Sequence, residues 1–93
     1  MANFYHVYVM RNKDASKEQV EEELDLHLDW FRYYAFLKVG VYIVYSDSEA
    51  RDLVHRLSPF AKPEGSVFVC KLDVTNRQGW MSKQFWEWLR KLR

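Results

Sequence analysis

The stretch WFRYYAFLKVGVYIVY, residues 30–45, decides the fold. Most of its side chains are aromatic or β-branched, a composition typical of β-strands. Lys38 and Gly40 interrupt the run, and glycine is the natural residue for a turn or a bulge. The stretch therefore predicts two strands, residues 31–37 and 41–45, with the turn or bulge at Gly40.

The segment before this stretch predicts a strand and then a helix. FYHVYVM, residues 4–10, is a strand pattern. Ser16 and Gln19 form a capping box that begins a helix over residues 17–28. One acidic face of this helix consists of Glu18, Glu21, Glu22 and Asp25. We interpret it as a solvated face, while a second interpretation, that it occupies the basic groove of a nucleic-acid-binding protein, stays open.

The segment after the stretch predicts a helix, a strand and a last helix. Ser46 and Glu49 form a second possible capping box, and Pro59 ends the helix that follows. SVFVCKLDV, residues 66–74, predicts a fourth strand, and residues 79–93 predict a tryptophan-rich C-terminal helix. The order predicts an α+β protein in one domain, a ferredoxin-like βαββαβ two-layer sandwich with an extra C-terminal helix.

Composition and charge exclude some classes of function. The 93-residue chain is 17% aromatic, with 4 Trp and 6 Tyr, an excess that suits a binding surface as well as a core. Its formal net charge of +1 does not make the whole chain an electrostatic nucleic-acid binder. A lone cysteine, Cys70, permits no intramolecular disulfide, and its apolar surroundings predict burial. No apolar run approaches ~18 residues, so we predict no membrane association and a cytoplasmic location.

No catalytic constellation is visible in the sequence. His6, His27 and His55 fall on three different predicted elements, without the paired spacing of metal ligands. HExxH, CxxC, GxSxG and glycine-rich phosphate loops do not occur. We therefore predict no catalytic residue, no metal site and no cofactor.

The predicted sheet has apolar side chains on both faces. On its third strand Val41, Ile43 and Tyr45 share one face, and Tyr42 and Val44 share the other. The helices of a two-layer fold cover one face, so the C-terminal helix, a second copy of the chain or a ligand must cover the other. We predict an interface formed by Tyr42, Val44, Trp80, Trp86 and Trp88.

The aromatic strands also permit nucleic-acid binding. RNA-recognition domains share the βαββαβ order and stack bases on aromatic side chains of the first and third strands. The candidate residues here are Tyr5, Tyr8, Lys38, Tyr42 and Tyr45. Gly40 stands where a stacking aromatic residue is expected, so the pattern is half satisfied.

Several segments carry a resemblance to a known family. They are YHVY (5–8), Trp30 with VYIVYSD (41–47), SEARDLVHRL (48–57), GSVFVCKL (65–72) and GWMSKQFWEWL (79–89). Through them the chain resembles the small ferredoxin-like proteins grouped with the second CRISPR-associated spacer-acquisition subunit, especially their SinR-like relatives. The resemblance covers most of the chain, and its closing Gly-Trp and Trp-Glu-Trp-Leu segment is the most distinctive part.

This resemblance implies a symmetric homodimer built by packing sheets together. Members of the group that are claimed as nucleases place a metal-binding aspartate at the end of strand one. Here Val9 or Met10 holds that place, and the nearest acid, Asp14, lies beyond the strand. We therefore predict a non-catalytic homodimeric protein-interaction or regulatory module, acting in phage–host conflict. The alternatives are an RNA- or DNA-binding domain and a residual metal-dependent nuclease.

Overall fold

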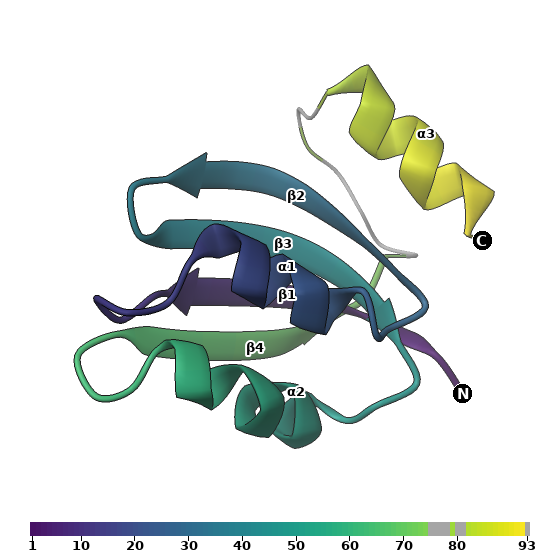
Figure 1. Cartoon of the computed structure of the whole chain (residues 1–93). Coiled ribbons are helices and arrows are strands. Elements are labelled where there is room, and N and C mark those ends of the chain that lie inside the picture. The colour runs from purple at the N-terminus through teal and green to yellow at the C-terminus, as the bar shows by residue number, and fades with distance from the viewer. Residues whose placement is uncertain (75–78, 80–81, 93) are drawn as a thin grey trace.

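The computed structural model describes residues 1–74, 79 and 82–92. Its elements are β1 (Asn3–Met10), α1 (Lys17–Leu24), β2 (Asp29–Phe36), β3 (Val39–Ser46), α2 (Ala50–Leu57), a short 3-10 helix (Ser58–Phe60), β4 (Ser66–Leu72) and α3 (Lys83–Lys91) (Figure 1). The α+β class predicted from the sequence is confirmed. None of the helices among these residues is long and apolar enough to cross a membrane.

The four strands form one antiparallel sheet in the order β2-β3-β1-β4. β1 and β3 are the central strands and pair along their whole length, from Asn3 opposite Ser46 to Met10 opposite Val39. The long connections through α1 and α2 each pass over the sheet, whereas β2 and β3 are joined by a tight hairpin (Figure 1). The register fixes which side chains share a face.

α1 and α2 lie on the same face of the sheet (Figure 1). Their buried residues, Val20, Leu24, Leu53 and Leu57, pack on alternate residues of the strands, Tyr5, Val7, Val9, Tyr42 and Val44. The predicted capping box of Ser16 and Gln19 begins α1. The helix ends at Leu24 instead of residue 28. The second box is formed by Glu49 and Asp52, not by Ser46.

α3 packs against the opposite face, at one end only. Phe85 and Leu89 contact Phe4 of β1 and Ile43 of β3, and Phe31, Tyr45 and Leu72 pack around them. These residues lie where β1 and β2 begin and where β3 and β4 end, away from the β2–β3 hairpin (Figure 1). The C-terminal helix therefore covers part of its own sheet, which the sequence left undecided.

The β2–β3 turn is not at Gly40. The strands are joined through Leu37 and Lys38, and Leu37 adopts a left-handed conformation with φ of 52°. Gly40 lies inside β3, where a Cβ atom would stand 2.6 Å from the hydroxyl oxygen of Tyr42. The glycine is therefore required by the ring that packs over it. A β-bulge does occur, but it lies in β2 between Arg32 and Tyr34.

Candidate functional site

Three of the predicted site residues are buried against the helices. Tyr5, Tyr42 and Val44 lie in the core beneath α1 and α2. The predicted base stacking on Tyr5 and Tyr42 and the predicted interface through Tyr42 and Val44 are corrected accordingly, because none of the three is accessible to a base or a partner. Alternation along a strand could have revealed this, since Tyr5 and Tyr8 must lie on opposite faces, as must Tyr42 and Tyr45.

The other predicted residues are divided between the α3 end and the hairpin end of the opposite face. Tyr45 packs on Phe4, with 4.7 Å between ring centroids, in the cluster that α3 covers. Trp88 also contacts the Phe4 ring, and Trp86 contacts Phe85, so both half-buried tryptophans help to hold α3 on its own sheet. Tyr8 is half-buried near the hairpin end, and Lys38 is exposed at the turn. Trp80 lies outside the described residues.

The hairpin end of this face carries an uncovered group of side chains, here called the open sheet surface. By strand register it comprises His6, Tyr8, Met10, Tyr34, Phe36, Val39, Val41, Ser66, Phe68 and Cys70, and the contact of Tyr33 with His6 adds Tyr33. Tyr33 and Tyr34 are neighbours across the bulge, and the Tyr33 hydroxyl lies 2.9 Å from Nε2 of His6. Cys70 is exposed, so its predicted burial is wrong.

The open sheet surface is large for so small a chain. Phe36 is 62% exposed, Phe68 60%, Tyr34 49% and Tyr33 39%. An aromatic side chain has about 150–250 Å² to bury, so these four rings together present roughly 400 Å² to solvent. The largest apolar patch of a typical monomer is of about this size, and such a patch often has a function.

The open sheet surface carries no carboxylate, lysine or arginine. His6 is its one basic side chain, and burial raises the pKa of the Tyr33 phenol beside it above the usual value. Lys38 stands at the edge, on the hairpin turn. Depletion of charge together with aromatic and methionine side chains is the composition of a protein–protein interface core. It lacks the cations with which proteins neutralise phosphates.

The hairpin tip beside this surface is held in place by Arg11, the residue that follows β1. The main-chain N–H of Arg11 donates to the carbonyl of Lys38 at 2.8 Å, and its Nη2 donates to the carbonyl of Leu37 at 2.7 Å. A left-handed conformation is unfavourable for leucine, and these two bonds fix it. Leu37 is nevertheless 78% exposed, so a strained turn presents an apolar side chain to solvent.

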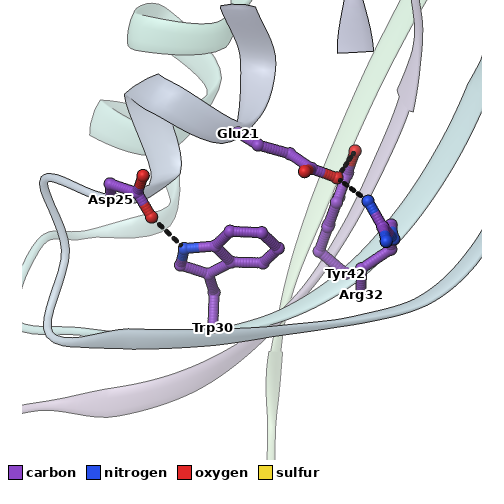
Figure 2. Close-up of polar contacts among 5 residues, drawn as sticks. All are labelled: Glu21, Asp25, Trp30, Arg32 and Tyr42. Carbon is purple, nitrogen blue, oxygen red and sulfur yellow. Dashed lines mark hydrogen bonds and ion pairs between the residues drawn. The ribbon is translucent and has the colours of Figure 1, made fainter. Parts of the chain in front are cut away.

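Part of the acidic face of α1 is bonded to the sheet instead of being free. Oε2 of Glu21 accepts from Nη1 of Arg32 at 2.7 Å and from the Tyr42 hydroxyl at 3.3 Å, and Oδ1 of Asp25 accepts from Nε1 of Trp30 at 2.7 Å (Figure 2). Burial, and then the Glu21 carboxylate, raise the pKa of Tyr42 to about 12. Glu18 and Glu22 remain exposed. This cluster holds α1 onto β2 and β3. No sequence motif predicted these contacts.

Two further polar residues have structural roles that the sequence did not indicate. The buried amide of Asn12 donates to the carbonyls of Pro59 and Lys62 and accepts from the N–H groups of Asp14 and Ala15. It thereby joins the β1–α1 loop to the loop before β4. Buried Ser46 lies 2.9 Å from Nδ1 of His27.

The histidines and carboxylates are not gathered into a metal site. In the part of the chain that the structure describes, no group of three His, Cys, Asp or Glu side chains could hold an ion. Burial, and then the charge of Arg56, lower the pKa of His27 below its usual value. Asp14, the acid named in the nuclease alternative, is exposed in the loop after β1.

Comparisons of the chain with protein-family models, with curated proteins and with solved structures gave no match. The resemblance to the CRISPR-associated group stays a prediction.

Proposed function

We propose that this chain is a non-catalytic protein-interaction module that forms a homodimer through the open sheet surface. The observation that carries the proposal is an uncharged, aromatic half of a sheet face that no described residue packs over, beside a half that α3 covers. A role in phage–host conflict stays a prediction from the resemblance.

We assign the scaffold to the ferredoxin-like type. The support is the order of elements from β1 to β4, the central position of β1 and β3, and the placement of α1 and α2 on one face. In this arrangement the second face of the sheet is left to whatever follows β4. α3 supplies a cover for one end of that face and leaves the other end to a partner.

The area of the open sheet surface fits a modest dimer. A standard interface buries about 800 Å² per partner, and the four exposed rings supply roughly half of that. The half-buried residues between them, including Tyr8, Met10 and Val41, add to it. Because the surface has no charged group to pair or desolvate, burying it carries little electrostatic penalty.

A second copy is the partner that this surface fits best. An uncharged surface needs an equally uncharged one opposite, and a two-fold axis supplies such a surface without another protein. Strand addition at the β2 edge is disfavoured because the bulge between Arg32 and Tyr34 interrupts a regular ladder. Strand addition at either edge, β2 or β4, would also leave the exposed rings on the sheet face uncovered, so the sheets would meet face to face.

Size exclusion with light scattering tests this proposal on the unmodified protein. At tens of micromolar we expect a mass twice that of the 11.3 kDa chain, with an absorbance spectrum free of nucleic acid. A strictly monomeric mass at that concentration would remove the homodimer.

Nucleic-acid binding is the second candidate. It is favoured by Tyr8, Tyr33 and Tyr34, which could form a stacking platform for bases on the open sheet surface. It is opposed by the absence of lysine and arginine from that surface. Anisotropy of labelled single-stranded RNA and DNA at two salt concentrations separates the candidates, since true binding must weaken steeply with salt.

The residual nuclease has less support, because Val9 is buried and Asp14 stands alone in its loop.

A further inference from the structure

We infer that α3 dictates an antiparallel homodimer in which the hairpin tip of each copy lies against α3 of the other. The inference rests on the proposed homodimer and adds to it a defined orientation and a second contact, between Leu37 and the partner's helix. It is drawn from the position of α3, from the exposure of the tip and from the polarity of the outer side of α3.

α3 protrudes from the face of the sheet that the dimer would use. The helix covers Phe4 and Ile43, while the open sheet surface extends to the hairpin end. Figure 1 shows α3 and the β2–β3 hairpin at opposite ends of the sheet. An α-helix is about 10 Å thick, and two sheets packed directly are about 10 Å apart. A second sheet can therefore contact the open end directly, but it cannot also pass over α3.

A two-fold axis along the strands would put both helices at the same end of the dimer. Their outer sides, with exposed Lys83, Glu87 and Arg90, would then face each other. Two stacked helices would hold the sheets about 20 Å apart, and the two open sheet surfaces would not meet at that end. This parallel arrangement leaves uncovered the apolar area that the dimer is proposed to bury.

A two-fold axis perpendicular to the strands keeps the two α3 helices from stacking on each other. The two open sheet surfaces then overlap, and each α3 lies beyond the hairpin tip of the other copy. In this arrangement the β2–β3 hairpin tip of one copy lies against the side of α3 in the other copy, so Leu37 is buried against the partner's helix. Leu37 is fixed in its left-handed conformation by Arg11 and is exposed at the end of the hairpin. Because it is already rigid, its burial against the partner's α3 costs little conformational ordering.

Site-specific photo-crosslinking tests the orientation. The photoreactive residue p-benzoylphenylalanine replaces Lys38, which is exposed at the tip, and the protein is mixed with an equal amount of ¹⁵N-labelled protein. Light scattering first measures the mass of the labelled protein. After irradiation, mass spectrometry identifies adducts that join a light chain to a heavy one, and locates the residue that the probe reached.

The antiparallel dimer predicts that intermolecular adducts fall within residues 83–92 of the other copy, at least tenfold more often than within its hairpin, residues 36–39. Adducts mainly between two hairpins would overturn the orientation while leaving the dimer intact. A monomeric mass with no mixed adducts would instead overturn the proposed homodimer and this inference with it. The same probe in a Phe68→Lys chain is the control and should lose the mixed adducts.

Discussion

The two ends of one sheet face differ in what covers them, although their sequences are alike. At the α3 end, Phe4 and Ile43 are buried under Phe85 and Leu89. At the hairpin end, Tyr8 and Val41 stand in the same alternation on the same strands, and nothing in the described chain packs over Phe36 and Phe68 beside them. Apolar alternation thus indicates that a face is to be covered, and does not indicate whether the same chain or a partner covers it.

The largest loss of stability should come from truncating a buried side chain at the end of the sheet that α3 covers. Leu89 is 1% exposed, in contact with the sheet, and we expect Leu89→Ala to lower the free energy of unfolding by about 2–5 kcal/mol. Urea denaturation at low protein concentration measures this in the monomer. A loss below about 1 kcal/mol would mean that α3 contributes little to the fold, and the two ends would then be alike.

The next effect concerns the fully covered helix face. Gly40→Ala places a methyl group against the Tyr42 ring, which must move away from Glu21. We expect a loss of about 1–3 kcal/mol by urea denaturation, as for overpacking of a core. Leu37→Gly is the matched change at the turn and should be neutral or slightly stabilising, because glycine accepts the left-handed conformation. Equal losses from both would contradict the reassignment of the turn.

A smaller effect is expected from the polar contact beneath the same face. Tyr42→Phe removes the hydroxyl bonded to Glu21 and should cost about 1 kcal/mol. Since the pKa of Tyr42 is raised to about 12 from an ordinary value of 10, its contribution is present below pH 10 and is lost as pH rises from 10 to 12. Ultraviolet titration should therefore show a phenol with a pKa of about 12, and should lack it in the variant.

The smallest effect on the monomer should come from the open end. Phe68→Thr keeps a strand-forming residue and removes an exposed ring. We expect the monomer to change by less than about 0.5 kcal/mol, whereas self-association weakens. A monomer destabilised as much as by Leu89→Ala would show that the ring is already buried by its own chain.

The sequence predicted the parts of this fold that depend on periodicity. Val41, Ile43 and Tyr45 were assigned correctly to one face of the sheet. The hairpin turn was missed because Leu37 and Lys38 carry no turn signal. Their conformation depends on Arg11, which is distant in sequence.

The candidate site was predicted less well than the fold. Choosing aromatic residues by type placed Tyr5 and Tyr42 in the site, although alternation buries them. Tyr33 and Tyr34 were overlooked because a bulge, which no local pattern marked, puts both near the open sheet surface. Phe68 was also missed, because its pairing with Tyr8 is a register that only the structure gives.

The central claim is that the open sheet surface joins two copies of the chain, and sedimentation equilibrium of two matched variants tests it most directly. Phe68→Lys adds a charge to this surface, and Leu26→Lys adds one at a residue that is 67% exposed in the α1–β2 connection, outside it. We predict that Phe68→Lys weakens dimerisation at least a hundredfold and that Leu26→Lys leaves the dimer of the unmodified chain unchanged. Equal behaviour of the two variants, whether both dimeric or both monomeric, would contradict the account.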